Sequence, residues 1–300
     1  MSEIKNPAYR VLLPEWEGDE PWFELTPQQR KTILGGSPHR VAPMDKTQPV
    51  HERASTCESL LTVYPDAISI GGVMGASVER GDVGFGGLLL AAFSLFLLGA
   101  GIFKTGVDEL FTWTVIFPMG FIVFMMSFNL IKLAYLLPKD QPILIDRKSR
   151  KVVFSQVRFH SFWKFWVMPG FSSPVTVPWD SIQVRSYKFV QYMGSTLRDS
   201  YRLELWAPTP DNPRNLLVKE PIGYLGWYED EKLWQLYEHI RRYMEEGGPA
   251  IQHGEKLRKP RKGRDLPAFP EAVLTTLGGP ALSDEEVERL AEITPPQAII

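Results

Sequence analysis

The sequence predicts a mixed fold. We expect a membrane α-helical hairpin with two transmembrane helices, and an α+β cytoplasmic domain in which a small antiparallel β barrel or sandwich is capped by a C-terminal helix. Three observations predict it. Two uncharged apolar runs, 83–103 and 110–131, are separated by six residues. Short strand patterns with turn signals follow residue 138. One amphipathic helical pattern comes after these strands.

Each apolar run is long enough to cross a bilayer. The first has 21 residues and the second 22. At about 1.5 Å per residue, each helix would span roughly 30 Å, the thickness of the hydrocarbon core. Inside a bilayer the backbone must satisfy its own hydrogen bonds, so both runs should be helical. The alternative is a pair of buried helices in a soluble core, which we disfavour because two such runs this close together are rare in soluble folds.

The connection between the runs, residues 104–109, is so short that the helices must be antiparallel and both ends must lie on one side of the membrane. The distribution of Lys and Arg indicates which side. The connection holds one basic residue, Lys104, beside two acidic ones. The flanks hold seven: Arg80, Lys132, Lys139, Arg147, Lys148, Arg150 and Lys151. We therefore expect both termini in the cytoplasm and the connection outside.

Residues inside the apolar runs indicate how they pack. Gly87 and Ala91 form a small-xxx-small pair, which lets helix backbones approach closely. We favour packing of the hairpin on itself, with a homo-oligomer through the Gly87/Ala91 face as the alternative. Pro118 is expected to kink the second helix. No Asp, Glu, Lys, Arg or His lies within either run, which argues against a transporter or channel.

Residues 138–247 are expected to form the β domain. The segment 142–154 has two apolar runs around a charged turn, which is typical of a β-hairpin. The segment 229–246 has the apolar spacing of a helix, and two glycines end it. Residues 58–71 also read as a hairpin, one too small to fold alone. We expect it to pair with the sheet of residues 142–220, which makes the membrane hairpin an insertion into one β domain.

The termini differ from this central part. Residues 1–57 are polar and rich in proline, and the first 25 contain no apolar run typical of a signal peptide. The segment 58–82 leads into the membrane. The tail, 248–300, is expected to be irregular apart from a capped helix at 283–293. Six basic residues of the tail either contact lipid headgroups or form a solvated linker: Lys256, Arg258, Lys259, Arg261, Lys262 and Arg264.

Residues that carry chemistry are sparse. The single cysteine, Cys57, excludes an internal disulfide framework and any multi-cysteine zinc site. No histidine has a second metal ligand at a familiar spacing, and His239 is expected to be a surface or hydrogen-bonded residue. No nucleophile-elbow, P-loop or zinc-protease motif occurs. We therefore expect no enzyme, no catalytic or metal-binding residue, no cofactor and no nucleic-acid partner.

An aromatic cluster is the best candidate for a binding surface. Residues 159–167 contain five Phe and Trp rings in nine residues. As a strand, this segment would place Phe162 and Trp166 on one face and Trp163 and Phe165 on the other. Exposed aromatic clusters mark interfaces. We expect these four residues to bind a protein partner, and the alternative is that both faces are covered within the fold.

Two resemblances extend this interpretation. In its element order, its 142–154 hairpin and its PWDSI pattern, the cytoplasmic domain resembles bacterial pleckstrin-homology-like domains. With PILIDRKSRKVVF, VPWDSI and the FPEAVLTTLGG and LSDEEVERLAEI segments of the tail, the whole layout resembles uncharacterised proteobacterial membrane proteins associated with type VI secretion. This second resemblance implies a location in a bacterial inner membrane. It also implies an immunity or accessory protein that neutralises a cognate effector by binding. The alternatives are a membrane-anchored scaffold or lipid-sensing module and a membrane-associated enzyme.

Overall fold

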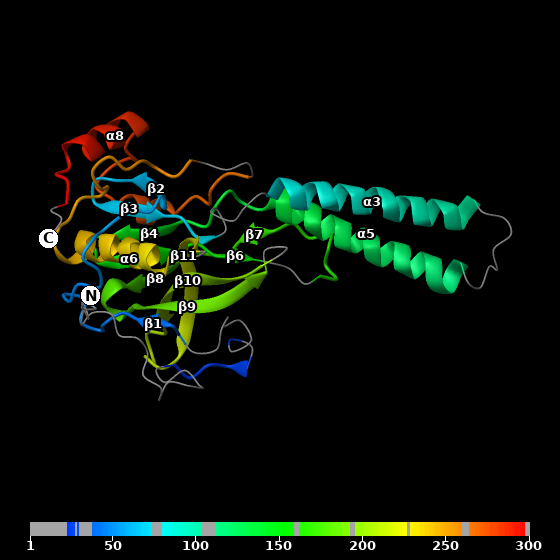
Figure 1. Cartoon of the computed structure of the whole chain (residues 1–300), viewed down its shortest axis with the longest axis horizontal. Coiled ribbons are helices and arrows are strands. Elements are labelled where there is room, and N and C mark those ends of the chain that lie inside the picture. The colour runs from blue at the N-terminus through cyan, green and yellow to red at the C-terminus, as the bar shows by residue number, and fades with distance from the viewer. Residues whose placement is uncertain are drawn as a thin grey trace.

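The computed structural model describes residues 23–27, 29, 38–73, 80–103, 112–158, 162–192, 196–226, 229–259 and 264–297. These residues form a mixed α+β body and a helical hairpin that projects from it along the long axis of the molecule (Figure 1). The predicted connection, 104–109, lies outside the described residues, as do residues 1–22 of the N-terminal segment.

The hairpin has two arms. The first is α3 (Arg80–Phe103). The second consists of a π-helical turn, η2 (Thr112–Ile116), then α5 (Phe117–Ile131), then a second π-helical turn, η3 (Lys132–Leu136). Pro118 is the second residue of α5, and α5 begins directly after η2. The backbone therefore departs from α geometry at the turn before this proline, which lacks the N–H that a regular helix needs. The second arm extends to Leu136, five residues past its predicted end at 131.

Small residues bring the two arms together. A Cβ on Gly84 would lie 2.5 Å from the Tyr135 ring, and one on Gly87 would lie 3.1 Å from the Ile131 side chain. Gly87 therefore serves the contact between α3 and the second arm, which is the packing that the sequence favoured. The alternative, a homo-oligomer through the Gly87/Ala91 face, would need Gly87 at a contact between copies. Gly87 is instead already buried within the hairpin.

Two antiparallel sheets form the body. The first has the order β2-β3-β4-β5-β8, with the bounds Leu60–Val63, Ala67–Ile70, Ile143–Asp146, Lys151–Phe154 and Val175–Pro178. The second has the order β1-β9-β10-β11, with the bounds Arg40–Val41, Gln183–Tyr192, Leu197–Pro208 and Leu216–Gly226. A short pair, β6 (Val157–Arg158) and β7 (Gly170–Phe171), stands apart from both.

The first sheet joins segments from before and after the helical hairpin. Strand β3 pairs antiparallel with β4, in a register that places Ala67 opposite Asp146 and Ile70 opposite Ile143. The predicted pairing of the early β-hairpin with the later sheet is therefore confirmed. Strand β3 precedes the helical hairpin in the chain, and β4 follows it. Because these two strands are antiparallel neighbours, the hairpin leaves the body and returns to it at the same end of the β3–β4 pair.

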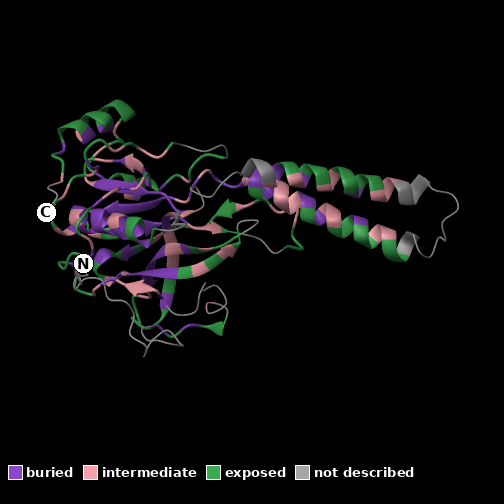
Figure 2. Cartoon of the chain, viewed as in Figure 1, coloured by how far each residue is buried: buried purple, intermediate pink, exposed green. Residues whose placement is uncertain are grey.

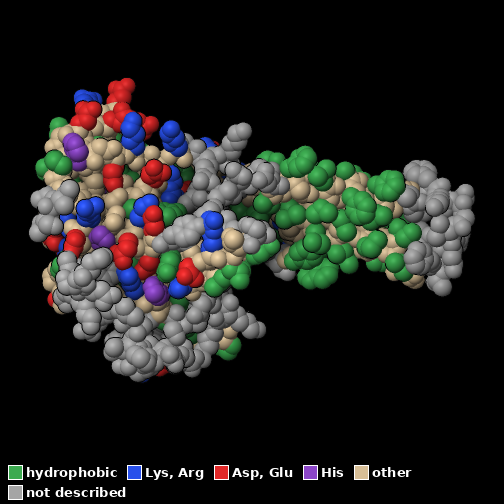
Figure 3. Space-filling model, in the orientation of Figure 1, with side chains coloured by type: hydrophobic (Ala, Val, Ile, Leu, Met, Phe, Trp, Pro, Cys, Tyr) green, Lys and Arg blue, Asp and Glu red, His purple; other side chains and the backbone are tan. Residues whose placement is uncertain are grey.

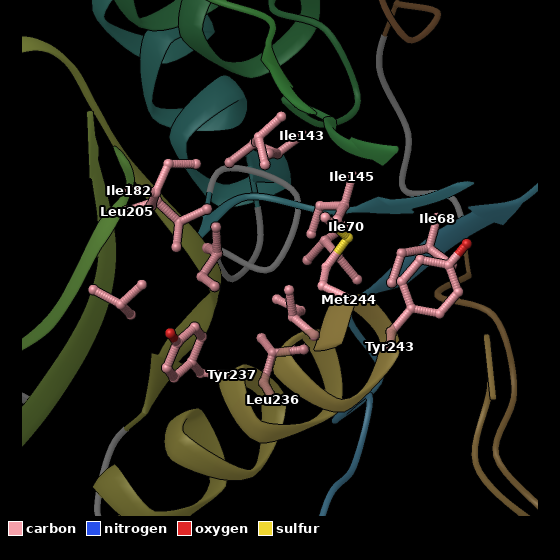
Figure 4. Packing of buried hydrophobic residues seen from close by; sticks show 14 of the residues in the cluster. Ile68, Ile70, Ile143, Ile145, Ile182, Leu205, Leu236, Tyr237, Tyr243 and Met244 are labelled. Atoms are coloured by element: carbon pink, nitrogen blue, oxygen red, sulfur yellow. The ribbon is translucent and has the colours of Figure 1, made fainter. Parts of the chain in front are cut away.

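The core lies between the two sheets and α6 (Asp230–Glu245). Figure 4 shows Ile68, Ile70, Ile143 and Ile145 of the first sheet and Leu205 of the second converging on Leu236, Tyr237, Tyr243 and Met244 of α6. Among the described strands the sheets do not close into a barrel, so the barrel form of the prediction is wrong. A short 3₁₀ turn, Trp179–Ser181, follows Pro178 and separates β8 from β9. Proline cannot donate to a strand ladder, which favours a break at this corner.

The tail covers the outer face of the first sheet. Phe269 and Leu277 pack there with Ala67, Leu144 and Val153, on either side of α7 (Glu271–Leu274). Helix α8 (Asp284–Ile293) has the predicted capping box, in which the Ser283 hydroxyl accepts from the Glu286 N–H. Val287 of α8 is buried in the main core cluster. The helix therefore docks on the body.

Candidate membrane-facing site

The hairpin exposes large apolar side chains along both arms. Phe85, Leu95 and Phe96 of α3 are each at least 60% exposed, and Phe121 and Ile122 of α5 are nearly half exposed. Figure 2 shows these exposed positions along the outside of the hairpin, and Figure 3 shows apolar side chains covering it. On the visible face of the body, charged groups are interspersed with other side chains (Figure 3). A soluble protein rarely leaves so large a contiguous apolar surface in water.

One described helix, Thr114–Leu136, is long and apolar enough to cross a membrane by length and composition. It has 23 residues, and only 17% of its most apolar window is buried. A core helix of a soluble protein with the same composition would be mostly buried. The first arm contains a shorter apolar helical stretch, Val83–Gly99. The exposure of both arms argues against the alternative of two buried helices in a soluble core.

The predicted aromatic segment lies beside this hairpin. Its residues 162–168, hereafter the aromatic loop, form turns between β6 and β7 and not a strand. The predicted division of its rings between two strand faces is therefore wrong. The physical reason is that β6 and β7 pair over only two residues each, so no ladder extends into the segment. Residues 159–161 lie outside the described part of the chain.

Phe165 attaches the aromatic loop to the second arm. Its ring centroid lies 6.1, 6.0 and 5.9 Å from those of Phe121, Phe124 and Phe128, and all three contacts are edge-to-face. This geometry is favourable for aromatic pairs. The other three predicted residues point outward: Phe162 is 40% exposed, Trp163 65% and Trp166 64%. The four rings thus divide into one that packs on the helix and three that are exposed.

Two polar side chains of the second arm complete this contact. The Asn129 Nδ2 donates to the carbonyl oxygen of Phe162 at 3.4 Å, and the Lys132 Nζ donates to that of Val167 at 3.0 Å. Lys132 is only 8% exposed, because the loop covers it. The sequence reasoning missed both roles and counted Lys132 only as a flanking charge. The sequence did contain a signal for this contact: Asn129 lies three residues before Lys132, and residues at this spacing share one face of a helix.

The basic residues of the tail have different surroundings. Lys256 pairs with Glu288 of α8 at 3.5 Å, and Lys259 is exposed. The backbone of Arg264 pairs with that of Pro138 and its neighbours, which places Arg264 at the base of the hairpin with its side chain exposed. Arg261 and Lys262 lie outside the described residues. The structure thus places Arg264 at the base of the hairpin and Lys256 beside α8, and the headgroup contacts expected for them stay a prediction.

Arg258 does not fit the lipid role expected for it. Its side chain is 9% exposed, and Nη1 lies 2.7 Å from the Asp140 carboxylate, which is itself buried. Its guanidinium also donates to four other groups: the carbonyl oxygens of Glu58, Gly72 and Gly223 and the Ser59 hydroxyl. The prediction of lipid contact is therefore wrong for this residue, because its donors are directed into the protein. Arg258 holds together the segments from which the hairpin leaves.

Other ionisable groups of the described residues serve the fold. No three His, Cys, Asp or Glu side chains of the described chain gather as a metal site would. Asp180, in the 3₁₀ turn after Pro178, accepts from the Arg150 guanidinium. Glu238 of α6 pairs with the buried Arg241 at 2.8 Å. Burial raises the pKa of the Cys57 thiol to about 11, so the thiol stays protonated at neutral pH.

His239 gives a pH-dependence that can be measured. It is fully buried on α6, where Gln252 donates to its Nδ1 at 2.9 Å, and burial lowers its pKa to about 4. Between about pH 6.5 and 4 the unfolded chain takes up a proton here that the folded chain does not. The free energy of unfolding should therefore fall as pH drops through this window, by about 3 kcal/mol from this residue.

Denaturant unfolding of the His239→Gln variant between pH 4 and 7 tests this expectation. The variant should show a shallower fall in stability with decreasing pH than the parent chain. His253→Gln, which removes an exposed histidine, is the matched control. Equal slopes for the His239→Gln variant and the parent would show that His239 does not contribute to the pH-dependence.

Comparisons with protein-family models, with curated proteins and with solved structures found no match for this chain.

Proposed function

We propose that this protein is a membrane-anchored binding protein, in which the hairpin of α3 and the second arm crosses a bilayer and the body lies at its cytoplasmic face. One observation carries the proposal: the hairpin projects from the body with its large apolar side chains outward (Figure 3). Transferring one exposed Leu or Phe from water to an apolar medium gains about 1.5–3 kcal/mol. Several such side chains on each arm favour a bilayer strongly over water.

The dimensions support a crossing. The 23 residues of Thr114–Leu136 extend about 34 Å at 1.5 Å per residue, and the 24 residues of α3 extend about 36 Å. A bilayer core needs about 30 Å. The helices also satisfy the requirement that the backbone bond to itself within lipid.

The Lys and Arg distribution supports the cytoplasmic orientation. Lys139, Arg147 and Lys148 follow the second arm, whereas the connection between the arms contributes Lys104 alone. Short basic flanks are retained on the cytoplasmic side. The apolar hairpin and these flanks together support the proposal of a bacterial inner-membrane protein with most of its mass inside.

The orientation predicts the activity of reporter fusions. Alkaline phosphatase is active only outside the cytoplasm, so phosphatase inserted after residue 107 should be active, and phosphatase fused after residue 300 should be inactive. A fluorescent protein that matures only in the cytoplasm should give the opposite pattern at the same two positions. An active phosphatase after residue 300 would contradict the proposed orientation.

The binding role is the part of the proposal that rests on the sequence. The resemblance to proteins associated with type VI secretion implies that the ligand is a cognate effector, which the anchored body would neutralise. Co-purification of the full chain with the product of a neighbouring toxin gene tests this role. Failure to co-purify would remove the effector role and leave the membrane anchor standing.

A further inference from the structure

We infer that the aromatic loop, residues 162–168, inserts into the cytoplasmic leaflet of the bilayer beside the second arm and forms a second membrane contact of the body. The inference rests on the proposed function, since it requires that the hairpin cross the membrane. It replaces the protein partner expected for these aromatic residues with a lipid one.

The contacts of Phe165 fix the depth of the loop. Its three ring partners, Phe121, Phe124 and Phe128, all precede Lys132, the last charged residue of the second arm. Phe128 lies four residues and Phe121 eleven residues before Lys132. At 1.5 Å per residue, these rings lie roughly 6 to 16 Å further from the body than Lys132 does. When the arm crosses a bilayer with Lys132 near the headgroups, Phe165 lies below the headgroup layer.

Several backbone groups of the loop have hydrogen-bond partners at this depth. Irregular backbone is tolerated near lipid only where its polar groups have partners. The carbonyl groups of Phe162 and Val167 accept from side chains of the second arm, as described above. The Val167 N–H donates to the Lys164 carbonyl at 3.0 Å, which closes the turn. Asn129 and Lys132, polar residues near the end of an apolar helix, therefore have a function that fits this location.

The exposed side chains of the loop match the boundary between headgroups and acyl chains. Tryptophan combines an apolar ring system with an N–H donor and is enriched at this boundary. Trp163 and Trp166 are the two most exposed rings of the loop. Lys164, between Trp163 and Phe165 in the sequence, is exposed and can extend its charge toward lipid phosphates. Interfacial segments of this composition lie about 5–10 Å deep.

The position of the loop favours lipid over a protein partner. Phe121 contacts Phe165 and is still 49% exposed, so the outward surface of the loop continues into that of the hairpin. A surface at this level of the hairpin faces lipid when the hairpin spans the membrane. A protein partner would have to reach the loop within the lipid headgroup layer.

Depth-dependent quenching tests the inference on the full chain. The chain is reconstituted into phosphatidylcholine and phosphatidylglycerol vesicles that contain lipids with a quencher at either a shallow or a deep acyl position. A fluorophore is attached to cysteine in the Trp163→Cys variant for the loop, in Ile122→Cys for the hairpin and in Glu292→Cys for α8. Helix α8 lies at the end of the body away from the hairpin (Figure 1). The parent chain is the labelling blank, because Cys57 is partly buried and protonated.

We expect the label at 163 to lose most fluorescence with the shallow quencher, the label at 122 to be quenched by lipid as well, and the label at 292 to be unaffected. Quenching at 122 without quenching at 163 would overturn the inference and leave the anchor standing, and it would favour the protein partner. No quenching at 122 would overturn the proposed function itself. Lys164→Cys gives a second loop position, and it should reproduce the result if Trp163→Cys fails to fold.

Discussion

Replacing residues 74–136 by a short Gly/Ser linker should move the protein from the membrane fraction to the soluble fraction while the body stays folded. The chain ends at this cut are close together, because the Gly72 N–H donates to the Asp140 carboxylate at 2.9 Å. Six residues can bridge about 20 Å, which is ample. None of the described residues in the main core comes from the hairpin. The deletion therefore removes lipid-facing surface and leaves the packing of α6 against the sheets intact.

Fractionation of cells after a carbonate wash measures the shift, and circular dichroism of the soluble product measures the fold. Insertion of the same linker after residue 137, with the hairpin retained, is the matched control and should stay in the membrane. Retention in the washed membrane fraction would show that another segment anchors the chain. An unfolded product would show that the hairpin belongs to the fold of the body.

The parts of the fold that the sequence predicted depend on local signals. The two long uncharged runs were predicted to be helices because, within lipid, the backbone groups of a segment must bond to each other. The β3–β4 pairing followed from the small size of the early hairpin and from the geometry of the membrane insertion, which returns the chain to the same side. Closure of the sheets was a different question. Whether they form a barrel depends on contacts between distant strands that no local pattern encodes.

The site was only partly predictable for the same reason. The aromatic content of residues 159–167 marked a binding surface, but we expected the segment to be a strand. The rings of Phe121, Phe124 and Phe128, about forty residues earlier in the chain, provide the surface on which Phe165 packs. A pattern within nine residues cannot contain that information. Basic runs, in turn, are usually solvated, and Arg258 is buried only because the fold brings several acceptors around it.

Arg258→Ala should be among the most destabilising single substitutions in the tail. The guanidinium makes a buried ion pair with Asp140 and donates to four further groups, as described above. Removing one partner of a buried pair leaves an uncompensated charge and typically costs about 3–5 kcal/mol. The Gly72 and Gln141 N–H groups still donate to Asp140, so its carboxylate would keep part of its stabilisation. The expected loss is therefore about 3 kcal/mol, at the lower end of that range.

Chemical denaturation of the full chain in detergent micelles measures this loss, and Lys259→Ala is the matched control. Lys259 is the exposed neighbour of Arg258, and a surface change of this kind alters stability by less than about 0.5 kcal/mol. Arg258→Lys should recover only part of the stability, since an ammonium group cannot reproduce the planar fork of donors. Adding Asp140→Asn to Arg258→Ala should also recover part of it, because the unpaired charge is then gone. If Arg258→Ala instead kept its stability and lost binding to anionic vesicles, Arg258 would be a headgroup ligand after all, and the buried pair with Asp140 would not hold the base of the hairpin.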